Sequence, residues 1–387
     1  MLLRNVTFFL ICCLLLTGCS FHPVQKAEAY LTHLYRRIPY TIEGDYRVID
    51  IFYASAREIK TKKDGSLKFT SKLADRPTAG RLTAKIDPTL TIGKMIPSRL
   101  RRKGIIGLQK VERLDDAVFI EQLKKAVDTS PHHSLLVTVF GYKDDFEMTS
   151  IKASYFVYLL DINTPILMFD WPGDQPVSIS GYNKARKLAE PSGAYLGAVL
   201  TEIIRKVKPK ELWIESSSLG CQVVCDAFEY MYRHHDLADA DEEITHVILT
   251  APDVGEDEFD ERFKDEITAL TERLTTYVSS NDEALLLSSI ISMEKKLGRQ
   301  KTIKPKEQEH FEEAKDLLYL QSLKPDKFAM VDVTPINKAS YNHGYYLEAP
   351  EYFDDFYLRV RSKKVDANRR LYLIKHKDNI DYWVLRD

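Results

Sequence analysis

The sequence lacks several features that mark familiar classes of protein. Its formal net charge is −2, so no excess of positive charge attracts nucleic acid. It has no internal repeat, no low-complexity tract and no glycine-rich phosphate loop. Its two histidine pairs, His132-His133 and His234-His235, are adjacent, and adjacent side chains point apart on a strand or a helix. We therefore expect no nucleic-acid partner, no metal and no cofactor.

Cysteine is also scarce. Of the 5 cysteines, Cys12 and Cys13 lie in an apolar N-terminal run, and only Cys221 and Cys225 lie beyond Cys19. These two are four residues apart on a predicted helix, a poor geometry for a disulfide, so we expect them to pack in the core. The chain must then fold on a large hydrophobic core, which its 387 residues can supply.

The N-terminus reads as a targeting segment at residues 1–18. Arg4 precedes an apolar run at residues 8–16, which is too short to span a bilayer comfortably. The following "LTGC" resembles a bacterial lipobox, which implies cleavage before Cys19 and acylation of its thiol. Ser20 follows instead of aspartate, which favours the outer membrane, facing the periplasm. A plain signal peptide or a short membrane anchor is the alternative.

The rest of the chain predicts an α/β fold. Residues 19–45 read as a polar tether, and residues 46–105 hold two alternating runs, predicted as an N-terminal β extension. Across residues 106–360, short apolar runs alternate with helical patterns, which predicts a mostly parallel, doubly wound sheet with helices on both faces. We expect the reacting groups beyond the carboxyl ends of its strands.

Three further elements follow from local patterns. The run that starts at Ser192 is predicted as a helix capped by that serine. The charged insertion at about 291–327 is predicted as a solvated helical excursion, with a lid or a docking arm as the alternative. Residues 361–387 read as a hairpin.

The segment "ELWIESSSLGCQVVCDAF" places three serines between a strand pattern and a helix pattern. A nucleophile on a tight strand-to-helix turn needs small residues two before and two after it. Centred on Ser218, these positions hold Ser216 and Gly220. Centred on either other serine, at least one flank is large. Ser218 is therefore the candidate nucleophile, and a polar turn that caps the helix is the alternative.

A serine nucleophile needs a base and an acid, which follow it in the order acid, then histidine. His310 lies on a charged helical pattern and His376 in a terminal strand pattern, whereas His343 lies in the loop "YNHGYY" after the last core strand. His343 is thus the candidate base. Asp253 and Asp282 each follow a predicted strand, and either could instead form a turn or cap a helix. We assign the acid to Asp282 because its strand precedes the histidine loop directly.

Seven segments in order resemble bacterial α/β-hydrolases of unknown function, the DUF900 family, whose members are often lipoproteins or exported. They are "IDIFYASAR", "VTVFGYKDDFE", "LMFDWPG", "IESSSLGCQVV", "VILTAPDV", "YVSSNDEALLLS" and "NHGYY". The chain departs from the family at Phe140 and Lys143, in the oxyanion-loop segment, and at Ser216-Ser217. The positions of Ser218, Asp282 and His343 keep the pattern.

The resemblance implies an α/β-hydrolase fold and acyl transfer to water through Ser218, Asp282 and His343. The backbone N–H groups of Leu219 and Tyr142 would form the oxyanion hole.

Candidates for the substrate pocket are Phe140, Lys143, Trp171 and Tyr345. The expected substrate is a small-molecule or lipid ester, and the expected membrane contact is through lipidated Cys19. No particular protein partner is indicated. A catalytically silent scaffold of the cell envelope is the alternative function.

Overall fold

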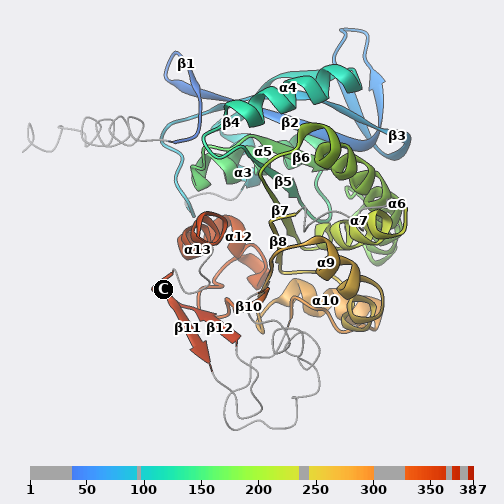
Figure 1. Ribbon diagram of the computed structural model, residues 1–387, viewed down its shortest axis with the longest axis vertical. Helices are drawn as coiled ribbons and strands as arrows, with labels where there is room; N and C mark the ends of the chain where they lie inside the picture. The colour runs from blue at the N-terminus through green and yellow to red at the C-terminus, as the bar shows by residue number, and fades with distance from the viewer. Residues whose placement is uncertain (1–36, 94–96, 235–243, 300–326, 363–367, 375–381) are drawn as a thin grey trace, which may run out of the picture.

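Twelve strands form one sheet in the computed structural model of the chain, which describes residues 37–93, 97–234, 244–299, 327–362, 368–374 and 382–387 (Figure 1). The strands are β1 (Thr41–Glu43), β2 (Tyr46–Thr61), β3 (Leu67–Ile86), β4 (Ile106–Leu114), β5 (Ser134–Val139), β6 (Ile166–Asp170), β7 (Glu211–Ser217), β8 (His246–Thr250), β9 (Leu274–Val278), β10 (Phe328–Asp332), β11 (Leu371–Ile374) and β12 (Tyr382–Leu385).

The centre of the sheet is parallel and its two ends are antiparallel. The strand order is β11-β12-β10-β9-β8-β7-β5-β6-β2-β3-β4, with β1 paired to β2. All pairs from β2–β6 through to β10–β12 are parallel. The pairs β1–β2, β2–β3, β3–β4 and β11–β12 are antiparallel. The prediction of a mostly parallel sheet is thus confirmed.

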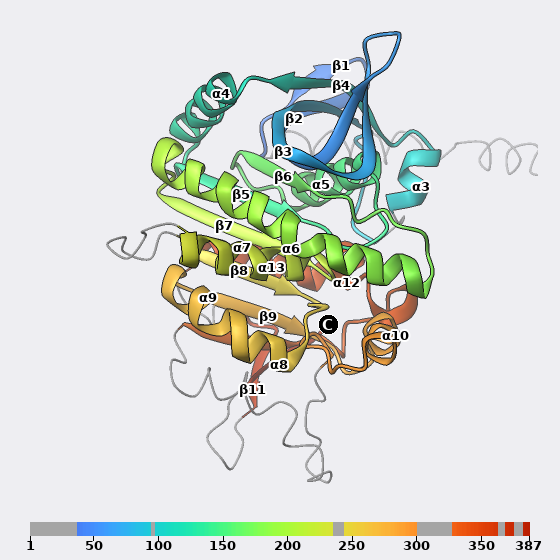
Figure 2. The same cartoon turned by 90° about the vertical axis from the view of Figure 1, so that its right-hand side faces the viewer.

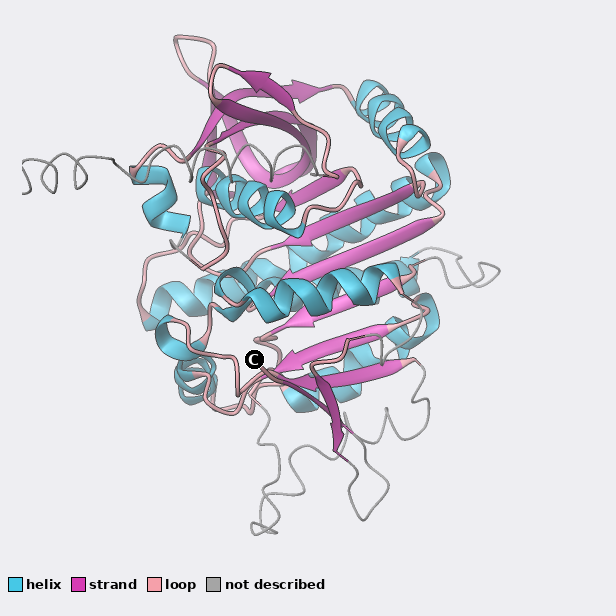
Figure 3. Cartoon of the chain, turned by 90° about the vertical axis from the view of Figure 1, so that its left-hand side faces the viewer, coloured by secondary structure: helices cyan, strands magenta, loops and turns pink. Residues whose placement is uncertain are grey.

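Helices cover both faces of this sheet (Figure 3). They are α3 (Pro97–Arg102), α4 (Asp116–Thr129), α5 (Phe146–Leu160), α6 (Ile179–Glu202), α7 (Gly220–His234), α8 (Glu256–Glu258), α9 (Lys264–Leu270), α10 (Glu283–Ser292), α12 (Tyr345–Glu348) and α13 (Pro350–Arg361). Short π-helical turns follow at Ile203–Val207 and Phe259–Phe263, and a 3₁₀ turn, η4, spans Ser340–Asn342.

Alternate residues of each central strand enter two different cores. On β7, Leu212 and Ile214 pack in the core under α4, α6, α7 and α9, the helices on the face seen in Figure 2. Trp213 packs in the opposite core, with α5, α12 and α13. Successive side chains of these strands point to opposite faces, and both faces are buried. Such strands therefore appear in the sequence as continuous apolar runs.

The sheet order creates a topological switch point, where a site is expected. From β5 the chain moves to β6 on one side, and it then returns to β7 on the other side of β5. Ligands of doubly wound sheets bind at such a switch point, beyond the carboxyl ends of the strands. Here the ends are Val139 on β5 and Ser217 on β7.

The run predicted as an N-terminal β extension joins the main sheet, because β2 pairs with β6. Two expectations about other elements need correction. Ser192 lies inside α6, where its hydroxyl donates to Leu188 O at 2.6 Å, and Ser178 is the N-cap instead. The insertion predicted to be solvated begins with a buried stretch at Lys296 and Leu297, while residues 300–326 lie outside the described residues.

The predicted C-terminal hairpin is antiparallel between β11 and β12, and its expected turn lies outside the described residues. β12 also pairs with β10, so this hairpin continues the sheet.

Candidate active site

Ser218 occupies the tight turn between β7 and α7. Its φ is 54°, in the left-handed region, which costs a residue with a side chain on the order of 1–3 kcal/mol. Its N–H donates to Thr250 O at 2.9 Å, and its carbonyl accepts from the amides of Cys221 and Asp253 at 3.0 and 3.1 Å. These bonds to the end of β8 and to α7 hold the strained conformation. The side chain of Ser218 is partly exposed, whereas Ser217 is wholly buried.

Close backbone approaches explain the small residues around Ser218. A Cβ on Gly220 would lie 2.4 Å from Val139 O, so any larger residue would push α7 away from β5. A Cβ on Gly141 would lie 2.7 Å from the Ser218 Cβ. Ser216, the small residue before the turn, is buried and donates from its hydroxyl to the Cys221 sulfur at 3.3 Å. A serine side chain therefore fits at position 216, where the turn motif usually has glycine.

Asp282 and His343 are in direct contact. The Oδ2 atom of Asp282 lies 2.7 Å from Nδ1 of His343. The carboxylate is wholly buried, and the imidazole is 19 % exposed. With Nδ1–H donating to this carboxylate, Nε2 of His343 is left as a proton acceptor.

The same carboxylate also caps a helix. Asp282 is the N-cap of α10, and its Oδ1 accepts from the amide of Leu285 at 2.9 Å. Its carbonyl accepts from Arg299 Nε at 3.1 Å. The sequence left open whether Asp282 is an acid or a cap, and the structure gives it both contacts.

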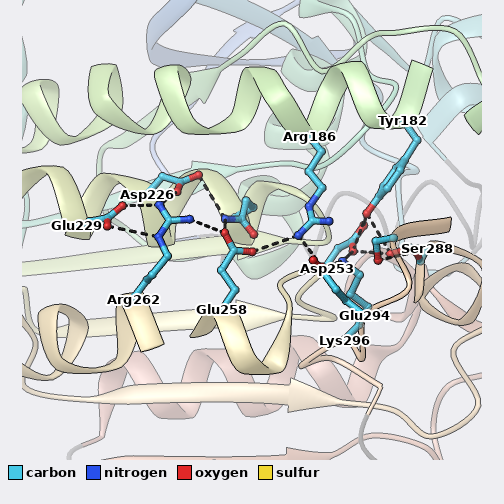
Figure 4. Close-up of polar contacts among 12 residues, drawn as sticks. Tyr182, Arg186, Asp226, Glu229, Asp253, Glu258, Arg262, Ser288, Glu294 and Lys296 are labelled. Atoms are coloured by element: carbon cyan, nitrogen blue, oxygen red, sulfur yellow. Dashed lines mark hydrogen bonds and ion pairs between the residues drawn. The ribbon is translucent and has the colours of Figure 1, made fainter. Parts of the chain in front are cut away.

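Asp253 has different partners. Its carboxylate accepts from the Tyr182 hydroxyl at 3.0 Å to each oxygen and from the Ser288 hydroxyl at 2.5 Å, and it lies 3.3 Å from the Lys296 ammonium (Figure 4). All four residues are buried, with exposed fractions of 6 % or less. Asp253 caps no helix, because Gly255 is the N-cap of α8. The carboxylate instead joins α6, α10 and the start of the insertion behind the Ser218 turn.

A second set of ionic groups continues along the same side of the sheet (Figure 4). Arg186 of α6 bridges Glu258 and Glu294, and Arg262 pairs with Glu229 and Glu258. Burial raises the pKa of a further member, Asp226, to about 8, with the charge of Arg262 counteracting part of this rise. These pairs connect α6, α7 and the chain that follows β8.

The amides proposed for an oxyanion hole belong to Leu219, which follows Ser218, and to Tyr142, which follows Gly141 in the loop after β5. In the described part of the chain, neither N–H donates to another backbone group outside the regular helices and strands. Arg57 holds the loop after β5, because its Nη2 donates to Asp144 O at 2.8 Å. Arg57 is itself buried and paired with Asp170 at 2.8 Å.

Three of the four pocket candidates belong to the core. Phe140, Trp171 and Tyr345 are 1 %, 3 % and 0 % exposed. The Trp171 Nε1–H donates to Phe140 O. The Tyr345 hydroxyl accepts from the Ala251 amide and donates to Tyr277 O. We therefore correct their role from lining a pocket to supporting the loops. Lys143 is exposed beside the site.

Sequence reasoning missed a group of polar residues beneath the turn. Glu215, on β7, is wholly buried, and neither of its carboxylate oxygens has a hydrogen-bond partner among the described residues. Burial raises the pKa of Glu215 to about 8, and Lys152 counteracts part of this rise. Burial alone would lower the pKa of Lys152, but Asp144, Tyr346 and Glu215 outweigh it and leave the pKa raised. In the sequence, Glu215 was considered only as a residue too large to flank a nucleophile at Ser217.

Tyr346 was also missed. Its ring stands edge-on to the His343 imidazole, with the centroids 6.5 Å apart. Its place next to Tyr345 in "NHGYY" was the only signal in the sequence.

Two cavities lie away from these residues. One of about 240 Å³ lies between β3, α4 and α6, and one of about 310 Å³ lies beside the amino-terminal parts of β2 and β6. Neither is lined by Ser218, Asp282 or His343. Within the described ranges, no group of three His, Cys, Asp or Glu side chains is arranged to hold a metal ion. None of the helices in the described part of the chain is long and apolar enough to cross a bilayer.

Comparison with known proteins places the chain in a family. The model of the α/β-hydrolases of unknown function, DUF900, matches residues 115–361, so the chain belongs to this family of α/β-hydrolase proteins. The match confirms the resemblance and the fold class, and it supports a hydrolase. No curated protein matches the chain.

One solved structure, from a study of two fungal esterases of Rhizomucor miehei, is similar over 88 % of this chain and 90 % of that chain. The identity is 12 % and the TM-score is 0.34.

Proposed function

We propose that the protein is a serine hydrolase that cleaves carboxylic esters. Ser218 attacks the carbonyl carbon while Nε2 of His343 takes the hydroxyl proton and then gives it to the leaving alcohol. Water repeats the sequence on the acyl-enzyme and releases the acid. Asp282 holds the imidazole in the tautomer that this requires and stabilises its positive charge.

The observation that carries this proposal is the 2.7 Å contact between Asp282 Oδ2 and His343 Nδ1, in a chain whose Ser218 has a φ of 54° on a strand-to-helix turn. The amides of Leu219 and Tyr142 are proposed to bind the oxyanion. Such donors contribute about 3–4 kcal/mol each to transition-state stabilisation in well-studied hydrolases.

A fluorophosphonate probe tests the nucleophile, because it reacts with an activated serine. Wild type should be labelled, and Ser218→Ala should lose both labelling and ester turnover. Ser217→Ala is the matched control and should keep measurable activity. Equal loss in both variants with folding intact would mean that the wrong serine is assigned. No labelling of folded wild type would favour a catalytically silent scaffold.

We also propose that the chain is tethered to the cell envelope, in the outer membrane and facing the periplasm, through acylated Cys19. The support is the lipobox-like sequence alone. Stable anchoring needs more than one acyl chain, since each buried CH₂ contributes only about 0.8 kcal/mol. Cys19→Ser should move the protein from membrane to soluble fractions or block its processing. Unchanged fractionation together with unchanged gel mobility would contradict the proposal.

A further inference from the structure

Helix α10 leaves several of its apolar residues exposed. Leu285 and Ser288 are buried, and the partly buried Ile291 packs against the core. Leu287 and Ile290 are nevertheless 58 % and 66 % exposed, and Met293, just past the helix, is 91 % exposed. Apolar residues of a surface helix normally face the core.

Other exposed apolar residues lie beside this helix. Val177 and Ile179, at the start of α6, are 80 % and 64 % exposed. The start of α6 adjoins α10, because the hydroxyls of Tyr182 and Ser288 lie 3.1 Å apart, and Figure 2 shows the two helices next to each other. Turn η4, which bears the 76 % exposed Tyr341, contacts α10. We call Val177, Ile179, Leu287, Ile290, Met293 and Tyr341 the apolar rim.

Part of the apolar rim lies on the segments that carry the candidate acid and histidine. Asp282 begins α10 as its N-cap, and His343 follows Tyr341 by two residues. These segments also carry the exposed side chains of Leu287, Ile290, Met293 and Tyr341. An exposed apolar patch of this kind marks a surface that binds another apolar surface.

The chain outside the structure indicates which surface that is. The apolar run at residues 8–16 and Cys19 both precede Arg37, the first described residue. With Cys19 acylated, as proposed above, the bilayer is within tether length of the domain. The chain from Cys19 to Arg37 spans at most about 60 Å when extended at about 3.3 Å per residue. A bilayer is thus held at high local concentration next to the domain, whereas a second copy is not.

We propose that the apolar rim docks on the phospholipid bilayer and that the ester cleaved at Ser218 belongs to a membrane lipid. The second part rests on the proposed hydrolase function. Docking puts the acyl chains of the bilayer against α10 and η4, so an ester group at the bilayer surface reaches the crevice without a deep pocket in the protein.

Brominated phospholipids test the docking directly, because bromine on the acyl chains quenches a tryptophan that enters the bilayer. Full-length Ile290→Trp is mixed with phosphatidylcholine vesicles that contain brominated chains, and the quenching of wild type, which has 3 tryptophans, is subtracted. The matched control is Ile42→Trp, at a site on β1 that is 65 % exposed. Ile42 is only five residues from Arg37, so tethering without docking would favour quenching at position 42.

We expect strong quenching at position 290 and little at position 42. Leu287→Glu combined with Ile290→Glu should reduce the release of fatty acid from vesicles by about tenfold or more, since each substitution removes an apolar contact. Turnover of a soluble ester should be unchanged in this variant. Equal quenching at both positions, or none at position 290, overturns the docking.

The two parts of the proposal fail in different ways. If position 290 is quenched and Ser218 is labelled by the fluorophosphonate, but the vesicles release no fatty acid, the lipid substrate is overturned and the hydrolase stands. If Ser218 is not labelled in folded protein, the hydrolase itself is overturned. Quenching can be repeated in Ser218→Ala, so the docking is tested independently of both.

Discussion

Asp253 and Asp282 follow neighbouring parallel strands at the same edge of the sheet, yet their surroundings differ. Asp282 meets an imidazole that is 19 % exposed and so can exchange protons with a substrate. Asp253 meets a wholly buried ammonium and two hydroxyl groups. Both carboxylates lie beyond a strand end, so their partners distinguish them: Asp282 contacts the candidate base, whereas Asp253 links buried groups of three segments.

The largest expected effect separates the two aspartates. On an ester that wild type hydrolyses, Asp282→Asn should lower kcat by about 10⁴, because the imidazole would be held in the wrong tautomer. Asp253→Asn should keep kcat within about tenfold. Both kcat and the denaturation midpoint should be measured for each variant. If Asp253→Asn loses turnover and Asp282→Asn keeps it, the two roles are reversed.

Asp253→Asn should instead reduce the free energy of unfolding. The sequence indicates a cap or a turn at Asp253, which predicts a loss of about 0.5–2 kcal/mol in the free energy of unfolding. The structure raises this to about 3 kcal/mol, because Lys296 would lose its nearest buried carboxylate. Glu294, at 3.4 Å from the Lys296 ammonium, limits the loss.

The pairing of Asp253 with Lys296 can also be tested by substituting the lysine. Lys296→Met should cost about 3–5 kcal/mol, since it leaves Asp253 buried without its cation. The double variant with Asp253→Asn should cost less than the sum by about 1 kcal/mol or more, as measured by denaturant unfolding. Lys295→Met, at the exposed neighbouring position, is the control and should change stability by about 0.5 kcal/mol or less. Additive losses would show that the two groups do not interact.

Glu215 extends the comparison to a carboxylate that accepts no hydrogen bond among the described residues. Its pKa is raised from 4.5 to about 8 in the folded chain, so between these values the folded state holds a proton that the unfolded state has lost. Stability should therefore fall with rising pH across this window, by up to about 1.4 kcal/mol per pH unit. Glu215→Gln should reduce the slope in unfolding curves taken from pH 5 to about 8 and leave the part that comes from Asp226, whose pKa is also raised to about 8.

Glu211→Gln is the control for this measurement, because Glu211 is only partly buried at the start of the same strand. It should leave the slope in place. An unchanged slope in Glu215→Gln would mean that Glu215 titrates normally in the folded protein.

The smallest effect concerns the hydroxyls on Asp253. Tyr182→Phe should cost about 1.5 kcal/mol, because its hydroxyl donates to a charged group. Tyr195→Phe, whose hydroxyl donates to Ala74 O, should cost about 1 kcal/mol or less, since that acceptor is neutral. Thermal unfolding measures both. Equal losses would mean that the charge of Asp253 contributes nothing at this distance.

Much of the fold was predictable because local patterns and the strand order agree. Short apolar runs predicted the central strands, and runs with helical spacing predicted the helices. Glycine is required beside Ser218 because a Cβ on Gly220 would lie 2.4 Å from Val139 O. The prediction that Ser192 caps a helix was wrong, because a serine before an apolar run resembles a cap. A serine inside a helix can also donate to the carbonyl four residues earlier, as Ser192 does to Leu188.

The support around the candidate site was not predictable. Lys296 stands in a charged stretch that resembles a solvated insertion, and only the tertiary structure shows that it is buried beside Asp253. Glu215 is one polar residue in an apolar strand, and its burial depends on Lys152 from α5 and on α12 and α13 covering that face. Pairings between segments this distant leave no signal in a single sequence.

The order of the candidate residues along the chain has a consequence for biosynthesis. Ser218 is followed by Asp282 and then, after the insertion, by His343, while β12 at the very end of the chain pairs with β10, the strand that precedes the histidine loop. Domains complete their fold as units, generally from the N-terminal side as the chain is made. A growing polypeptide that has reached residue 300 would hold the nucleophile and the acid but no base. A partly synthesised chain that ends before His343 would therefore be unable to attack an ester in the proposed way, and any proposed activity against lipids would begin only after the histidine loop and β12 have been made.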